Sequence, residues 1–174
     1  MNVLDAINTR RSVRKWQKRA VAKTTLNKIL NAGRMAPSPL NSQPWHFSVI
    51  VDRKMIKTLA ASAQHGAFAQ SATVLIVVTI EQSAKVDTWL HEHDQHIYSG
   101  VCAIQNMWLA AWSLGIGGCW ITIDRKATEK LLGVPRSHVL LGSLALGHPT
   151  GKVHKHLDDD RRPLSDMVTF DSFR

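Results

Sequence analysis

The sequence has few features of a secreted or membrane-embedded protein. It contains only two cysteines, Cys102 and Cys119, which do not form a close-spaced pair. It contains no run of about 18 apolar residues, which argues against a transmembrane helix. Residues 1–11 show no cationic segment followed by an apolar one, so they do not resemble a signal peptide. We therefore expect a cytoplasmic protein with reduced thiols and no membrane partner.

Acidic side chains are scarce in the first 34 residues. Residues 1–34 carry nine Lys or Arg side chains and one acid, Asp5, whereas residues 35–174 carry 13 basic and 12 acidic side chains. Nearly all of the net charge of +9 therefore belongs to one short segment. Such a segment suits an anionic ligand, either a bound phosphate or a nucleic acid. Trp16 lies among the basic residues, but no known nucleic-acid-binding module surrounds it, so we expect no nucleic-acid partner.

The chain has the length and composition of one folded domain. Its 174 residues are enough to bury a core without metals or disulfides, and 44% of them are hydrophobic while 20% are charged. No internal repeat and no low-complexity segment divides the chain. We therefore expect a single domain over residues 1–174.

Hydrophobic periodicity predicts helices that alternate with strands. Apolar residues at helical spacing occur in the segments 2–9, 25–33, 53–60, 91–114 and 127–132. Strand-like apolar runs occupy the segments 45–51, 72–80, 119–123 and 139–146. Thr24 or Thr25 can cap the second helix, and Asp52 can cap the third. The alternation predicts an α+β or α/β sandwich.

The longest predicted helix, His91–Leu114, is apolar over more than one side. Its main stripe is formed by Ile97, Val101, Ile104, Trp108 and Ala111. Met107 and Trp112 add bulk beside the stripe, and Gly115 ends the helix. A helix that is apolar over much of its circumference is buried on several sides. One small domain has little material to cover it, so we expect a two-fold homodimer built around this helix.

A first candidate site follows the first helix. Arg10, Arg11, Ser12 and Arg14 place several donors within five residues. Guanidinium groups bind phosphate oxygens through paired, charge-assisted hydrogen bonds, and a serine hydroxyl adds a neutral donor. The segment therefore suits a terminal phosphate. The alternative is a solvated basic helix end.

A second candidate site is the loop Pro37–Trp45. Three prolines stiffen its first eight residues, and Ser, Asn and Gln side chains offer short polar groups. A planar heterocycle such as a flavin needs fixed donors and acceptors with little ordering cost. The alternative is a rigid loop that leads into a strand.

Metal binding and covalent catalysis receive less support. His91, Glu92, His93, Asp94 and His96 cluster in the sequence, and His93 and His96 are three apart on a helix, but no second matching pair lies nearby. His154, His156 and 158–160 fit an exposed tail, and Cys119 has no visible base partner. We therefore expect a polar helix entrance without a metal, and no catalytic side chain.

Together the two candidate sites resemble those of the nitroreductase family. The resemblance rests on Arg10–Arg14 near the N-terminus and on Pro37–Trp45 at a typical distance from it. Ala110–Trp120 and Arg161–Leu164 also agree with the family. The resemblance covers nearly the whole chain. Its ordered combination of motifs is specific, whereas no single motif is.

The resemblance implies a fold and an assembly. The fold is a three-layer α/β/α sandwich of the α+β class, with a central, mostly antiparallel sheet. The assembly is an interlocked homodimer with an FMN bound non-covalently at each subunit interface. Residues 151–174 form a C-terminal extension that we expect to pack on the partner subunit.

The resemblance also assigns roles to residues. Contacts to the phosphate and the ribityl chain fall to Arg10, Arg11, Ser12 and Arg14. A late phosphate contact falls to Arg161, or to Arg162 if the register shifts by one. The loop beside the flavin ring comprises Pro37, Ser38, Pro39 and Asn41. The segment that approaches flavin N5 comprises Ile121, Thr122 and Ile123.

Two departures from the family concern the flavin environment. Pro39 has no backbone N–H to donate, where relatives often have Ser or Gly. The stretch between Ile80 and His91 is short, whereas larger relatives carry extra helical material there. We therefore expect a shallow lid, or one supplied by the partner subunit.

The expected function is an FMN-dependent oxidoreduction. NAD(P)H and a small organic acceptor, such as a nitroaromatic or a quinone, would use the same cleft in turn by a ping-pong mechanism. The hard chemistry belongs to the cofactor. Flavin turnover or reductive dehalogenation is the alternative within the family.

Overall fold

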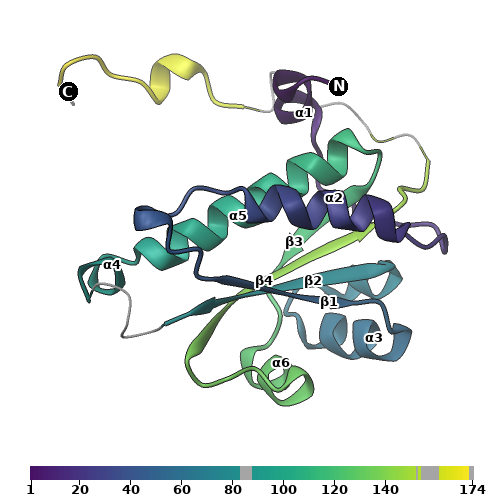
Figure 1. Cartoon of the computed structure of the whole chain (residues 1–174). Coiled ribbons are helices and arrows are strands. Elements are labelled where there is room, and N and C mark those ends of the chain that lie inside the picture. Colours follow the sequence, from purple (N-terminus) through teal and green to yellow (C-terminus); the bar gives the residue numbers. More distant parts are fainter. Residues whose placement is uncertain (83–87, 152, 154–160, 173–174) are drawn as a thin grey trace.

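A four-stranded antiparallel sheet forms the middle of the molecule in the computed structural model, which describes residues 1–82, 88–151, 153 and 161–172 (Figure 1). The strand order across the sheet is β1-β2-β4-β3. The strands are β1 (Trp45–Ile50), β2 (Val74–Glu81), β3 (Gly117–Ile121) and β4 (His138–Gly147). All three neighbouring pairs are antiparallel, which confirms the expected α+β class.

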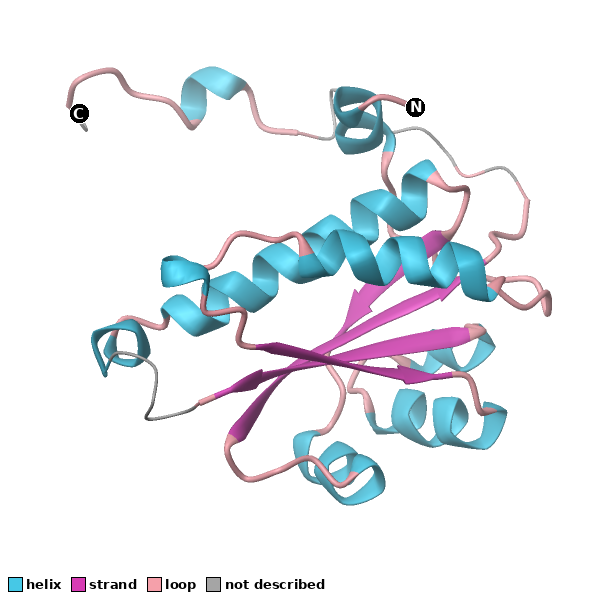
Figure 2. Ribbon diagram, in the orientation of Figure 1, coloured by secondary structure: helices cyan, strands magenta, loops and turns pink. Residues whose placement is uncertain are grey.

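Helices cover both faces of the sheet, so the expected three layers are confirmed (Figure 2). One layer contains α2 (Lys23–Arg34), α4 (Thr88–Glu92) and α5 (Gln95–Ser113), and α1 (Val3–Thr9) lies outside this layer against α5. The other contains α3 (Arg53–Ser62), η2 (Ala67–Ser71) and α6 (Arg125–Leu132). Short turns of 3-10 helix also form η1 (Pro39–Asn41) and η4 (Leu164–Asp166). None of the helices in the described residues is long and apolar enough to cross a membrane.

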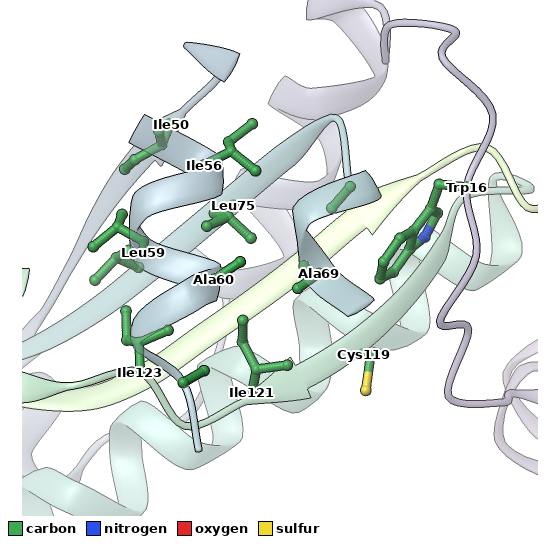
Figure 3. Close-up of a cluster of buried hydrophobic side chains, with 14 of the residues drawn as sticks. Trp16, Ile50, Ile56, Leu59, Ala60, Ala69, Leu75, Cys119, Ile121 and Ile123 are labelled. Carbon is green, nitrogen blue, oxygen red and sulfur yellow. The ribbon is translucent and has the colours of Figure 1, made fainter. Parts of the chain in front are cut away.

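The sheet separates two apolar cores. Every residue from Val74 to Ile80 on β2 is buried, because both faces of this strand are covered. Alternate residues face opposite layers: Leu75 packs with Ile56 and Leu59 of α3 (Figure 3). On the other face, Ile76 shares a core with residues of α2 and α5. Full burial of such a side chain contributes about 1.5–3 kcal/mol, so the two cores hold the strands in register.

Several helix starts differ from the sequence prediction, and α6 (Arg125–Leu132) begins two residues earlier than predicted. The predicted helix 91–114 is divided into α4 and α5, because Asp94 has a left-handed backbone with φ of 54°. Aspartate tolerates this conformation better than most residues, since its short side chain bonds locally. Helix α2 starts at Lys23 with Ala22 as its N-cap, so a cap by Thr24 or Thr25 was wrong.

The third helix begins as predicted. The side chain of Asp52 accepts a hydrogen bond from the backbone N–H of Met55 at 2.8 Å, and α3 follows directly. This cap satisfies one of the donors that every helix start leaves without an intrahelical partner. The local sequence alone therefore fixes where α3 begins.

Helix α5 divides its apolar surface between the sheet and the exterior. Ile104, Trp108 and Ala111 of the predicted stripe are buried in the described chain, together with Met107. Val101 of the same stripe is 37% exposed. The sheet thus covers the C-terminal part of the stripe. In the N-terminal part of the helix, Tyr98 and Val101 are exposed, whereas His96, Ser99 and Gly100 are buried.

Both ends of the chain lie outside the sandwich (Figure 1). Helix α1 buries only Ala6, and the segment 161–172 extends away from the sheet. Large apolar side chains are exposed on both: Val3, Leu4, Ile7, Leu164, Met167, Val168 and Phe170. Exposed apolar groups gathered in this way are typical of surfaces that meet another chain.

Candidate active site

The segment after α1 is fixed to the edge strand β3. The backbone N–H of Val13 donates to the carbonyl of Gly118 at 2.9 Å, and the indole N–H of Trp16 donates to the carbonyl of Gly117 at 2.9 Å. A side chain at position 117 would place its Cβ 2.7 Å from a methyl carbon of Val13, so only glycine permits this approach. The predicted Arg-Ser-Arg segment is therefore held to β3 on both sides of Arg14, by the backbone of Val13 and by the indole of Trp16.

Arg10 lies at the centre of a guanidinium cluster. Its guanidinium carbon lies 4.0 Å from the centroid of the Trp108 ring on α5, which stabilises the cation. Burial, and then the like charges of Arg161 and Arg11, lower the pKa of Arg10. The tail thus brings Arg161 close to the N-terminal cluster, and within the described residues neither Arg10 nor Arg161 forms an ion pair. An anion placed among these groups relieves their repulsion.

Arg11 has a structural contact that the sequence did not reveal. One guanidinium N–H group donates to the carbonyls of Arg10 at 2.6 Å and Asn8 at 3.4 Å, and the residue is 8% exposed. Basic side chains commonly bond the last carbonyls of a helix in this way. Arg11 therefore helps to end α1, whereas Arg10 and Arg14 keep their guanidinium groups for other partners.

Arg14 lines a cavity of about 400 Å³. The cavity is lined by Arg14, Gln64, His65, Gly66, Phe68, Cys119, Trp120, Ile121 and Thr122. The predicted residues Arg14, Ile121 and Thr122 therefore meet at one place. Ile123, in contrast, is 4% exposed and packs into the core beside α3. The volume lies in the range of ordinary small-molecule sites.

Sequence reasoning missed the segment Gln64–Phe68, which forms one wall of the cavity. Its residues have no distinctive spacing, and the strand order alone brings them to the end of β3. Phe68 is tied to the arginine segment: its ring stacks on Trp16 at 6.2 Å, and the guanidinium carbon of Arg14 lies 5.7 Å from its centroid. In the sequence, only its glycine distinguishes this segment. The structure explains that glycine, because a Cβ at position 66 would lie 2.3 Å from the Cβ of Ala63.

Cys119 is a buried thiol in this cavity. Burial raises the pKa of Cys119, while Arg14, a hydrogen bond from Ser12 and Arg10 act in the opposite direction. The net shift keeps the group protonated, and only a thiolate is a good nucleophile. Cys119 packs in the core beside Ser12.

The proline-rich loop is exposed and sharply turned. Leu40, Asn41 and Gln43 have positive φ angles of 52°, 55° and 47°. The hydroxyl of Ser38 accepts a hydrogen bond from the backbone N–H of Gln43 at 3.0 Å, which fixes the turn. The loop borders a second hollow of about 370 Å³, which is lined by Pro37, Ser38, Pro39, Gln95, Tyr98, Ser99 and Cys102. Asn41 itself is exposed outside this lining.

The two candidate sites lie at different ends of α5. The loop contacts α5 near Tyr98, whereas the arginine segment contacts it at Trp108 and at Trp112, whose indole N–H donates to the hydroxyl of Thr9 at 2.9 Å. At a rise of about 1.5 Å per residue, the ten residues from Tyr98 to Trp108 span about 15 Å. Within the described chain, the loop and the arginine segment therefore border two separate hollows that share no lining residue.

Comparison with known proteins agrees with this architecture. The family model described as "Nitroreductase family" matches residues 7–98 and 60–148. A protein of Archaeoglobus fulgidus named "Putative NADH dehydrogenase/NAD(P)H nitroreductase" is 34% identical over 163 residues, which cover 91% of each chain. A Thermus thermophilus protein named "NADH dehydrogenase" is 31% identical over 147 residues, which cover 83% of this chain and 68% of that protein.

A solved structure supports the same assignment. A nitroreductase-type protein of Desulfovibrio desulfuricans, determined in complex with FMN, superposes with a TM-score of 0.82. It is 31% identical, and the match covers 100% of this chain and 99% of that one. The matched family model covers most of the chain and includes the arginine segment, the proline-rich loop and β3. The chain belongs to the nitroreductase family.

Proposed function

We propose that this chain is an FMN-dependent oxidoreductase that uses NAD(P)H to reduce a small organic acceptor. The observation that carries the proposal is the guanidinium cluster of Arg10 and Arg161 beside the cavity lined by Arg14. Its concentrated positive charge suits the phosphate of FMN, since guanidinium groups bind phosphate oxygens in pairs. Family membership and the FMN complex of the Desulfovibrio desulfuricans relative support the same cofactor.

The residues present fit FMN on chemical grounds. Arg10, Arg14 and Arg161 would bind the phosphate, and the hydroxyl of Ser12 would add a donor. Thr122, exposed at the end of β3, and the backbone N–H of Ile123 would face flavin N5. When bound, FMN supplies the exchange of hydride and electrons. The positive charge of the arginines stabilises an anionic reduced cofactor, so no protein acid or base is required.

We further propose that the complete site needs two chains. The loop Pro37–Asn41 of one subunit would face the arginine cluster of the other, because the two parts lie about 15 Å apart along α5 within one chain. An apolar groove of about 360 Å³ between α1, α2 and α5 offers a contact surface for a second copy, with Met35, Leu109 and Ala110 in its lining. The exposed apolar residues of 161–172 would extend this contact over the partner.

The hollow beside the loop supports a proposal for the class of acceptor. Its lining contains proline, serine, glutamine, tyrosine and cysteine, but no charged side chain among the described residues. Tyr98 is 58% exposed there and presents an aromatic face. Planar neutral rings stack well on such a face. A neutral nitroaromatic or quinone therefore fits better than a carboxylated acceptor. NAD(P)H and this acceptor would occupy the cleft in turn.

One experiment tests both the cofactor and the assembly. The protein is mixed with FMN and sedimented at low micromolar concentration while flavin absorbance is followed. We expect flavin to sediment with a species of about twice the chain mass of 19.4 kDa. Flavin that sediments with a single chain would refute the shared site. A protein that takes up no FMN would refute the proposed function.

A further inference from the structure

Two histidines meet where α4 and α5 join. His91 lies in the last turn of α4, and His96 lies in the first turn of α5. The left-handed backbone of Asp94 turns the chain between them. As a result, the two imidazole rings lie with their centroids 4.9 Å apart and their planes tilted by 46°.

His96 is buried without a hydrogen-bond partner. It is 7% exposed, and neither Nδ1 nor Nε2 has a hydrogen-bond partner among the described residues. Nearly all buried polar groups in proteins are paired, so this ring calls for a partner that the described residues do not supply. A neutral imidazole has one nitrogen with a free lone pair. That nitrogen is the most common protein ligand for transition-metal ions.

The separation of the two rings matches that expected for a shared metal ion. Two imidazoles that bind one tetrahedral zinc ion through Zn–N bonds of about 2.0–2.1 Å have their ring centres about 5 Å apart. The observed separation is 4.9 Å. His91 is exposed, so an ion reaches this ring from solvent and then meets the inner ring of His96.

The third histidine of the segment is occupied elsewhere. The Nδ1 atom of His93 lies 2.9 Å from the carbonyl oxygen of Trp89, and its ring stacks on the Trp89 ring at 4.3 Å. The pair His93 and His96, which the sequence spacing favoured, is therefore not the pair that meets. Within the described residues no group of three or more His, Cys, Asp or Glu side chains is placed to bind a metal, so water would complete the coordination.

We propose that His91 and His96 form a two-histidine site for a divalent transition-metal ion such as Zn²⁺. Imidazole nitrogen is a suitable ligand for zinc, copper and nickel. The ion would cross-link α4 to the start of α5. Gln95 and Ser99, on either side of His96 along α5, line the hollow beside the proline-rich loop. Metal binding would therefore stabilise this wall of the hollow without entering it.

The test is a Zn²⁺ titration of FMN-loaded protein in phosphate-free buffer, followed by calorimetry. We expect about one ion per chain, and His91→Ala should weaken the affinity by roughly tenfold or more because one ligand is lost. His93→Ala is the matched control and should bind as the parent does. Zn²⁺ should raise the melting temperature of the parent and of His93→Ala, but not that of His91→Ala.

A second variant and a second metal make the result specific. His96→Gln should lose binding as His91→Ala does, and because His91 is exposed, His91→Ala decides the question even if His96→Gln fails to fold. The electron paramagnetic resonance spectrum of bound Cu²⁺ should show coupling to imidazole nitrogen that decreases in His91→Ala. Undetectable Zn²⁺ binding at about 100 µM, or equal affinity in the parent and His91→Ala, would overturn the proposal.

Discussion

The arginine cluster and the proline-rich loop contact opposite ends of α5, and they differ in how they are held. The arginine segment is held to β3 by a backbone hydrogen bond from Val13 and by the indole of the nearby Trp16, which is 6% exposed. The loop instead carries Leu40, which is 81% exposed, at a backbone angle that disfavours it. One half of the proposed flavin site is thus completed within the chain, whereas the other half is open to solvent.

This difference separates two roles that a binding site must fill. A phosphate needs fixed charge, which a segment built into the sheet edge supplies before any ligand arrives. A flat ring needs walls on two sides, and in the proposed dimer the exposed loop would supply one wall for a neighbouring subunit. Preorganised charge would then contribute affinity, and the second chain would complete the site.

The largest expected effect comes from releasing the arginine segment from β3. Trp16→Ala removes a buried indole, its hydrogen bond to the Gly117 carbonyl and its stacking on Phe68. We expect the free energy of unfolding to fall by about 3–5 kcal/mol, as for other buried aromatic truncations. Denaturant unfolding measures it. Trp16→Phe keeps the stacking and should lose much less. A loss below about 1 kcal/mol in Trp16→Ala would show that β3 holds the segment without the indole.

The next largest effect concerns the positive charge of the arginine cluster. Arg10→Ala, Arg14→Ala and Arg161→Ala should each weaken FMN binding by about 1.5–3 kcal/mol, the usual contribution of a hydrogen bond to a charged group. Fluorescence titration with FMN measures the change. Lys18→Ala is the control, since it removes an exposed cation from the same segment. Arg162→Ala tests the alternative register. Unchanged affinity in the first three variants would place the phosphate elsewhere.

A smaller effect is expected from the loop. Ser38→Ala removes the acceptor for the backbone N–H of Gln43, so the free energy of unfolding should fall by about 0.5–1.5 kcal/mol. Thermal unfolding of apo-protein measures this. Ser42→Ala should change it less, because no described hydrogen bond uses that hydroxyl. Equal effects of the two variants would mean that Ser38 does not fix the turn.

The smallest effect concerns Cys119. Burial raises the pKa of Cys119, so the folded chain retains this proton to higher pH than the unfolded chain does. The resulting stability is full below the ordinary thiol pKa of about 8.5 and is lost as pH rises beyond it. Urea unfolding between about pH 7 and pH 10 should therefore show a steeper decline for the parent than for Cys119→Ala. Cys102→Ala should follow the parent, and identical slopes for all three would refute the shift.

Features that depend on local chemistry were predictable from the sequence. The Asp52 cap, the buried strand around Val74–Glu81 and the helix end near Gly115 follow from short-range rules. The break at Asp94 does not follow from such rules, because a left-handed residue inside an apolar helical pattern changes no periodicity. The start of α2 after Ala22 does not follow from them either, because the packing of α2 on α5 overrides the preference for a threonine cap.

The candidate site likewise has parts that the sequence predicted and parts that it did not. The arginine segment and the proline-rich loop were recognisable because their residue types match a known pattern. Their separation along α5 depends on sheet order and helix length, which no motif records. The wall Gln64–Phe68 was missed because its lining residues, Gln64, His65, Gly66 and Phe68, form no recognisable motif. The contact of Arg11 with the end of α1 likewise depends on side-chain direction rather than on residue type.

The uninterrupted run of α5 also determines where this chain tolerates changes in length. Each residue inserted into a helix turns everything beyond it by about 100° and moves it by about 1.5 Å. One residue added between Tyr98 and Trp108 would turn Trp108 away from Arg10 and shift both candidate sites relative to each other. The connection at 133–137, between α6 and β4, has no such constraint. Insertions and deletions should therefore accumulate there while α5 keeps its length.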